Sequence, residues 1–206
     1  RPSFLHSEGH YRTLLKEKYG INSPYILQVG RLLPHKNIHR MIDGFDLAKQ
    51  KKYSPHQLVI LGGRGHALPY DKIVDESIGR AKFRNDIYIA PYIETEDLPI
   101  VYAFADFFIQ VGTLDGFSIP IIDALKMGIP IITSNTSVFP EIVGEAAYLV
   151  DPFNPKSIAD GILEVLNDPM LRRKLSSASL RKAEEYSWNK VAHETLEIYR
   201  KILAKH

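Results

Sequence analysis

Short apolar runs rich in β-branched residues alternate along the chain with longer stretches whose apolar positions recur every three or four residues. The first pattern predicts β-strands and the second predicts amphipathic helices. Nearly every short run is apolar throughout, which is typical of strands covered on both faces in a parallel sheet. The predicted strands are Tyr25–Arg31, Gln57–Gly62, Asp86–Ala90, Asp106–Val111, Pro130–Ser134 and Ala147–Asp151.

Helices are predicted before, between and after these strands. Alternating strands and helices indicate right-handed crossovers and an α/β fold, a Rossmann-like doubly wound parallel sheet of about six strands with helices on both faces. With the strand order 3-2-1-4-5-6, ligands bind outside the carboxyl ends of the first and fourth strands. The predicted helices are His6–Tyr19, Asn37–Lys52, Pro69–Lys82, Thr95–Ala105, Ser118–Met127, Ser157–Asn167, Pro169–Tyr186 and Ser187–Ala204.

Composition narrows the class of protein. The 206 residues are 45% hydrophobic and 24% charged, which is typical of a globular domain and excludes a disordered chain. The chain has no cysteine, which excludes disulfides and thiolate-bound metals and favours a cytoplasmic location. A formal net charge of +2 does not indicate a nucleic-acid partner. No apolar run approaches the roughly 20 residues of a membrane span.

Two cationic residues follow the first predicted strand. Arg31 and Lys36 are separated by a proline-containing loop, and a helix is predicted to begin at Asn37. Fixed cations beside a helix N-terminus are well suited to bind a phosphate or diphosphate. The alternative is that both are solvated surface charges. Their place at the switch point, where the strand order reverses between the first and fourth strands, favours the binding site over this alternative.

Two carboxylates follow the fourth predicted strand. Asp115 is in a loop, Gly116 allows close approach of the backbone, and a helix is predicted from Ser118 with Asp123 one turn inside it. The amides from Gly116 to Ile119 would be the unpaired donors of this helix, directed into the crevice. Taken singly, Asp115 is also compatible with a turn and Asp123 with an exposed helix charge.

Three motifs in this order resemble one known family. They are Gly-Arg-x4-Lys-Asn from Gly30, acidic-Gly-Phe-x-x-Pro-x-x-acidic from Asp115, and Gly-x-Pro-x3-Ser from Gly128. Together they are similar to the C-terminal donor-binding domain of the retaining, nucleotide-sugar-dependent glycosyltransferases of the GT-B fold, group 1 (family 4). The resemblance runs from about Tyr25 to Leu203 and includes the closing Tyr-Ser-Trp segment at Tyr186.

The resemblance implies roles for individual residues. Arg31 and Lys36 would hold the donor diphosphate and stabilise the leaving nucleotide, and Asp115 would lie near the transferred sugar; these three are the implied catalytic residues. Asp123 would bind the ribose hydroxyls. The segment Tyr92-Ile93 would receive the base of the nucleotide through its backbone. The remaining implied substrate-binding residues are Gly30, and Gly116, Phe117, Ser118 and Ile119 near the sugar and phosphates.

The resemblance also implies a donor and an organisation. The donor would be a UDP- or GDP-linked hexose, transferred with retention and without a metal or other cofactor. Residues 1–24 would form a connector and helix, and residues 25–206 the donor-binding domain. An enzyme of this fold needs a second, N-terminal domain for a sugar, lipid-linked or other acceptor, and 206 residues hold only one such unit, so we expect that domain to be separate; the missing initiator Met supports this expectation. Membrane association through that domain is left open, and the isolated chain is expected to be inactive.

Departures and competing patterns leave alternatives open. The family usually has Glu where Asp115 and Asp123 stand and Gly where Ser118 stands, so both acids have shorter reach and turnover would suffer more than binding. A non-catalytic nucleotide-binding or scaffold domain, or a sugar-nucleotide epimerase, are the alternative functions. The glycines from Gly62 to Gly65 suggest a dinucleotide fingerprint without its third glycine, and the pair His35 and His39 lacks a third metal ligand.

Overall fold

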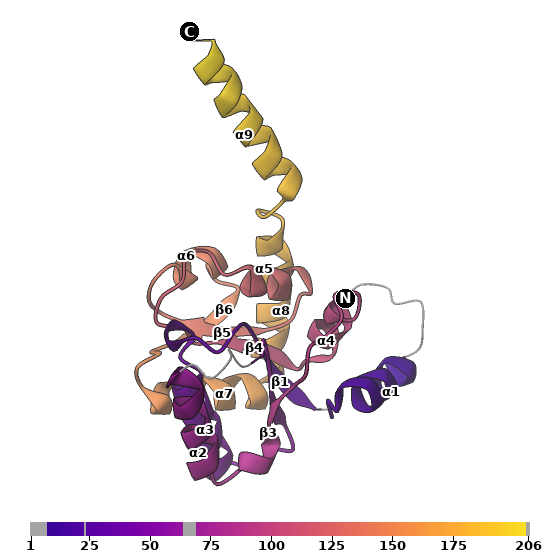
Figure 1. Cartoon of the computed structure of the whole chain (residues 1–206), viewed down its shortest axis with the longest axis vertical. Coiled ribbons are helices and arrows are strands. Elements are labelled where there is room, and N and C mark those ends of the chain that lie inside the picture. The colour runs from indigo at the N-terminus through magenta and orange to yellow at the C-terminus, as the bar shows by residue number, and fades with distance from the viewer. Residues whose placement is uncertain (1–7, 23, 64–68, 205–206) are drawn as a thin grey trace.

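The computed structural model describes residues 8–22, 24–63 and 69–204. Within these ranges, six strands form one parallel sheet in the order β3-β2-β1-β4-β5-β6 (Figure 1). This confirms the predicted fold class, with the order reversing between β1 and β4. The strands are β1 (Tyr25–Val29), β2 (Gln57–Leu61), β3 (Ile87–Ile89), β4 (Phe107–Gln110), β5 (Ile131–Ser134) and β6 (Ala147–Val150).

Helices cover both faces of the sheet, because the strands alternate their apolar side chains between two cores. Leu27 and Phe108 face one core, while Ile26 and Phe107 face the other. The first core packs under α1 (Glu8–Tyr19), α4 (Leu98–Phe104), α5 (Ile119–Lys126) and α6 (Phe139–Val143). The second core packs under α2 (Ile38–Lys51), α3 (Pro69–Arg80) and α7 (Pro155–Asn167), and α8 (Pro169–Ala183) contributes to both.

Several element boundaries differ from those predicted. The first strand ends at Val29 rather than Arg31, because Gly30 adopts a φ of 139° and leaves the extended conformation. Helix α4 begins at Leu98 rather than Thr95. The sequence pattern also missed α6 and two 3₁₀ helices, η1 (Pro34–Lys36) and η2 (Arg84–Asp86), which are too short for an apolar periodicity to develop. The predicted start of the first helix, at His6, lies outside the described residues.

The loops after β1 and β2 approach each other closely. A Cβ on Gly62 would lie 2.3 Å from the carbonyl oxygen of Gly30, and Gly62 has a φ of 132°. The amide of Gly30 in turn donates to the carbonyl of Leu61 across 2.8 Å. Only glycine fits such a crossing of two backbones. The contact fixes the path of the chain from the end of β1 toward Arg31.

Helix α1 packs on the same domain. Its residues Tyr11, Leu15 and Tyr19 are buried in the first core. At its end, Lys18 lies 2.7 Å from the Asp97 carboxylate, and the Tyr19 hydroxyl also donates to it. These contacts join α1 to the start of α4. The boundary predicted at residue 24 stays a prediction.

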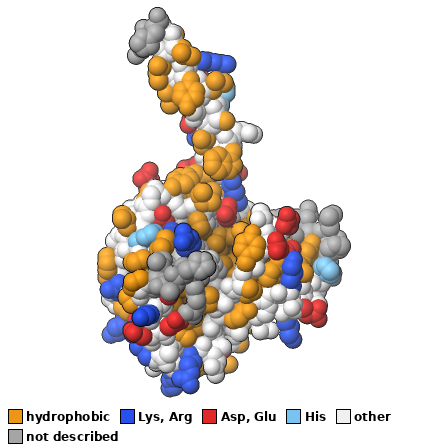
Figure 2. All heavy atoms as spheres, in the orientation of Figure 1, with side chains coloured by type: hydrophobic (Ala, Val, Ile, Leu, Met, Phe, Trp, Pro, Cys, Tyr) orange, Lys and Arg blue, Asp and Glu red, His pale blue; other side chains and the backbone are white. Residues whose placement is uncertain are grey.

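The last helix, α9 (Trp188–Leu203), projects from the body of the domain (Figure 1). None of its residues is buried, although it carries an apolar side visible in the space-filling view (Figure 2). No helix in the described ranges is long and apolar enough to cross a bilayer. The exposed apolar residues of α9 are Trp188, Val191, Leu196, Ile198, Tyr199, Ile202 and Leu203.

Candidate functional site

The ends of β1 and β4 are tied together by a buried asparagine. Asn37 follows η1 with a φ of 58°, a left-handed conformation that asparagine tolerates better than most residues. Its side-chain amide donates to the carbonyls of Val111, at 2.9 Å, and Pro152, at 2.7 Å. The backbone of Thr113 adds a bond to the carbonyl of His35 at 2.8 Å. The loop that carries Lys36 is therefore held against the loops that follow β4 and β6.

This arrangement brings two of the predicted catalytic residues together. The Lys36 ammonium lies 2.6 Å from Asp115 Oδ2, and only 12% and 16% of the two side chains are exposed. A Cβ on Gly30 would lie 3.8 Å from Lys36 Cε, so Gly30 borders the same place. The switch point of the sheet thus holds a partly buried ion pair formed by residues 79 positions apart.

The Asp115 carboxylate accepts three hydrogen bonds. Lys36 and the Gln110 amide both donate to Oδ2, the latter at 3.2 Å, and the Gly116 amide donates to Oδ1 at 2.9 Å. Burial raises the pKa of the Asp115 carboxyl, but the hydrogen bonds from Lys36 and the Gly116 amide and the nearby positive charge outweigh it, and the pKa is lowered. Asp115 is therefore a carboxylate at neutral pH. The Ser137 hydroxyl also accepts a hydrogen bond from the Asp115 amide and donates one to the Asp115 carbonyl oxygen.

Helix α5 begins directly beside this pair. Ser118 precedes the helix with a φ of 63° and is 5% exposed, while Gly116 is exposed and has open space where a Cβ would be. The exposed rings and chains of Phe117 and Ile119 flank Ser118. Of the four amides that the sequence predicts to be unpaired, the Gly116 amide donates to Asp115 Oδ1, and those of Phe117, Ser118 and Ile119 make no hydrogen bond to a described residue.

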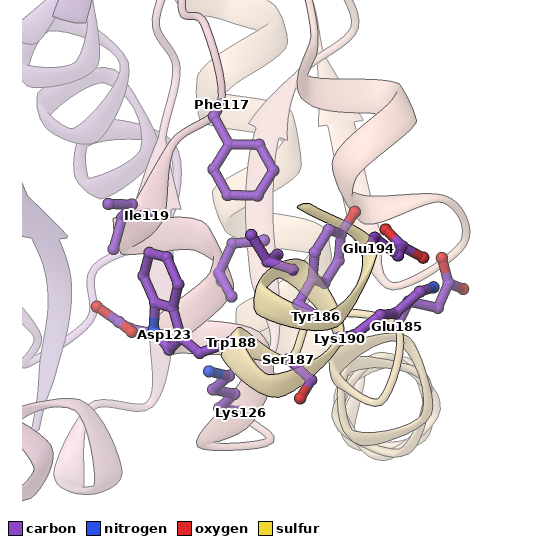
Figure 3. A pocket seen from close by; sticks show the side chains of 12 residues that line it. Phe117, Ile119, Asp123, Lys126, Glu185, Tyr186, Ser187, Trp188, Lys190 and Glu194 are labelled. Atoms are coloured by element: carbon purple, nitrogen blue, oxygen red, sulfur yellow. The ribbon is translucent and has the colours of Figure 1, made fainter. Parts of the chain in front are cut away.

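A cavity of about 250 Å³ lies on the exposed side of α5. Figure 3 shows Phe117, Ile119 and Asp123 facing Trp188 and Tyr186 across it. The Phe117 ring meets the Tyr186 ring edge-on at 5.9 Å. Three predicted binding residues thus line one cavity together with the start of α9, which the sequence did not assign to the site.

The pKa values of the two predicted acids, Asp115 and Asp123, are shifted in opposite directions. The Asp123 carboxylate makes no hydrogen bond or ion pair within the described part of the chain, and burial raises its pKa, with Lys126 opposing the rise. Asp115 has three donors and a lowered pKa. Asp123 is consequently an acceptor available to a ligand's hydroxyl groups, whereas Asp115 is already occupied.

Other predicted residues are not drawn into this cluster. Arg31 is exposed and makes no hydrogen bond or ion pair with any described residue. Tyr92 is 77% exposed and Ile93 is buried in the loop after β3, and neither lines the cavity. The roles of these three stay predictions. The fingerprint segment from Arg64 to His66 lies outside the described residues.

The structure adds residues that the sequence reasoning missed. Gln110, Asn37 and Ser137 bond to the ion-pair region, and Trp188 lines the cavity. One available signal was the polar Gln110 in an otherwise apolar strand. His39 bonds the Tyr70 hydroxyl at 2.9 Å, and no group of three or more His, Asp or Glu side chains suited to a metal occurs among the described residues.

Known proteins share this fold and are similar to this chain in sequence over most of its length. An O-antigen chain mannosyltransferase B from Escherichia coli is 30% identical over 176 residues, covering 85% of the chain and 45% of the relative. Sucrose-phosphate synthase from Thermosynechococcus elongatus superposes with a TM-score of 0.82 at 20% identity, covering 98% of this chain and 50% of that one. Anabaena HepE, in complex with UDP and glucose, gives 0.80 at 18% identity, covering 95% and 53%.

The chain spans about half the length of these proteins. The model of the family described as glycosyl transferases group 1 matches residues 12–182, which include the whole sheet, the Lys36–Asp115 pair and helix α5. With this match and the mannosyltransferase relative together, the chain belongs to the group 1 glycosyl transferases.

Proposed function

We propose that this chain is the donor-binding domain of a retaining hexosyltransferase that uses a nucleotide-diphosphate sugar. The observation that carries the proposal is the Lys36–Asp115 pair beside the amides that open helix α5. A cation and a helix N-terminus together favour a diphosphate, and an adjacent carboxylate favours a sugar that becomes positively charged as it leaves.

The reaction needs opposite charges at its two ends. The bond from the anomeric carbon to the diphosphate oxygen breaks with both electrons passing to the diphosphate, and the acceptor hydroxyl bonds to the carbon as its proton passes to the departing phosphate. Lys36, Arg31 and the α5 amides stabilise the leaving diphosphate. Asp115 stabilises the positive charge on the sugar, so catalysis is mostly electrostatic and positional and needs no metal.

The nucleoside end is proposed to occupy the cavity beside Asp123. An unbonded carboxylate accepts hydrogen bonds from the ribose hydroxyls, and the aromatic wall formed by Phe117 and Trp188 offers apolar contact to the rest of the nucleoside. Because relatives include a mannosyltransferase and a protein that binds UDP and glucose, both UDP and GDP are candidate carriers of the hexose.

The acceptor is proposed to bind to a second domain of a longer protein. The chain spans about half of its relatives, and the apolar side of α9 is uncovered. Burying that side against another domain removes apolar surface from water, which is the usual driving force for domain association. A sugar or lipid-linked acceptor and a cytoplasmic location, at a membrane face or free of it, are part of this proposal.

Calorimetric titration with UDP, GDP and ADP tests the donor site. We expect one nucleotide to bind, and Lys36→Ala or Arg31→Ala to weaken that affinity about 10- to 100-fold, the usual range for a lost charged hydrogen bond. Lys51→Ala is the matched control. Lys51 is the last residue of α2, roughly 20 Å along the helix from Lys36, and it pairs on the surface with Asp160. No binding of any of the three nucleotides would contradict the proposal.

A further inference from the structure

A buried glutamine at the end of β4 bonds two residues of the loop that leads into α5. Gln110 closes β4 and is 1% exposed. Its Nε2 donates to Asp115 Oδ2 at 3.2 Å and to Ser118 Oγ at 2.8 Å. Both hydrogens of the amide nitrogen are thereby used, one on the carboxylate and one on the residue that precedes the helix.

The Asp115 carboxylate has only one other side-chain donor among the described residues, which is Lys36. If the proposed function holds, a donor diphosphate attracts the Lys36 ammonium and draws it from Asp115. The carboxylate would then retain its Gly116 amide, which belongs to its own turn, and the Gln110 amide, which belongs to the rigid sheet. A neutral donor such as Gln110 is not drawn away by the anionic phosphates.

The amide is present at a cost to stability. The other residues of β4 are apolar, and the side-chain oxygen Oε1 of Gln110 is buried without a hydrogen bond from any described residue. A leucine or methionine of similar volume would avoid that unpaired acceptor. Packing alone therefore does not account for a glutamine at this position.

We propose that Gln110 is a positioning residue that holds the Asp115 carboxylate toward the transferred sugar while Lys36 is engaged by the donor diphosphate. Its second bond sets Ser118, so the carboxylate and the first amides of α5 keep a constant relative position. The proposal rests on the proposed donor site, but the hydrogen bond at its centre is measurable without any ligand.

The test compares Gln110→Leu and Gln110→Met with Ser118→Gly. Both replacements at Gln110 remove the donor to Asp115, and two variants protect the test against one that fails to fold. Ser118→Gly removes the other acceptor and suits the left-handed backbone, but it leaves the bond to Asp115 intact. The Asp115 carboxyl is followed by carbon-13 NMR across pH, without ligand and with saturating UDP or GDP, and thermal unfolding is recorded for each protein.

We expect the Asp115 pKa to be higher in both Gln110 variants than in wild type, and more so with nucleotide bound, while Ser118→Gly leaves it unchanged. We also expect the Gln110 variants to bind UDP or GDP within about threefold of wild type, because the cations remain. An unchanged Asp115 pKa in the Gln110 variants, or an equal change in Ser118→Gly, overturns the positioning role. If wild type binds neither nucleotide, the donor site fails, and the ligand-free titration still decides whether Gln110 holds Asp115.

Discussion

Lys36 Nζ and Asp115 Oδ2 lie 2.6 Å apart, across the ends of the two strands between which the order of the sheet reverses. Each residue is supplied by a different loop, and Asn37 joins those loops through the Val111 carbonyl. The Lys36–Asp115 ion pair is therefore formed by two residues that the fold brings together. Its consequences can be measured in stability as well as in binding.

Asp115→Asn should flatten the acid limb of the stability curve. The pKa of Asp115 is lowered in the folded chain, so its contribution is fully present above the ordinary carboxyl value of 3.8 and is lost as pH falls through the folded pKa. Urea unfolding measured between pH 7 and pH 3 tests this loss of stability. Wild type should lose stability more steeply than Asp115→Asn below about pH 4. Parallel curves would mean that the pair contributes nothing.

Asp123→Asn should raise stability and lower affinity in the same protein. Burial raises the pKa of Asp123, so the stability its neutral form contributes is complete below 3.8 and is lost as pH rises through the folded pKa. At neutral pH the uncharged amide should unfold at a higher urea concentration than wild type. Nucleotide affinity should fall at least about tenfold, since ribose hydroxyls lose a charged acceptor. Unchanged affinity would remove Asp123 from the site.

Trp188 should report nucleotide binding directly. It is the only tryptophan in the chain and lines the cavity together with Asp123 and Phe117. A nucleoside in that cavity displaces water from the indole, so titration with the nucleotide that binds should change the emission intensity or wavelength. The calorimetric and fluorescence affinities should agree. Binding heat with no change in Trp188 emission would locate the nucleoside elsewhere.

Gly62→Ala should be strongly destabilising. The new Cβ would lie 2.3 Å from the Gly30 carbonyl oxygen, and the φ of 132° disfavours any side chain. We expect a loss of about 2 kcal/mol or more in the free energy of unfolding, because backbone on both sides resists movement. Gly79→Ala is the control, since nothing lies within 4 Å of that Cβ in helix α3. It should be neutral or raise stability by up to about 1 kcal/mol.

The strands and most helices could be predicted from the sequence because their signals are local. An apolar run such as Phe107–Gln110 indicates a buried strand without knowledge of its neighbours. The predicted strand order also placed the loops that carry Lys36 and Asp115 at one ligand site, since they follow the first and fourth strands. The five residues of α6 are too few for such a signal. The partners of Gln110 follow it within eight residues, but its hydrogen bonds depend on the backbone conformation of that loop, which residue type and spacing do not reveal.

What the sequence determined by itself is the kind of fold, its parallel order and the loops that carry the chemistry, because hydrophobic periodicity and residue type act over a few neighbouring positions. Only the tertiary structure decided which charges are paired. In the folded chain the Asp115 carboxylate bonds to Lys36 and Gln110, and the Asp123 carboxylate has no partner among the described residues. Trp188 lines the same cavity as Asp123. The reason is that burial and charge partners such as Lys36, 79 positions from Asp115, are brought in by the fold, and these set the energy of a carboxylate. Gln110 is only five positions from Asp115, and its hydrogen bond depends on the folded conformation of the loop between them.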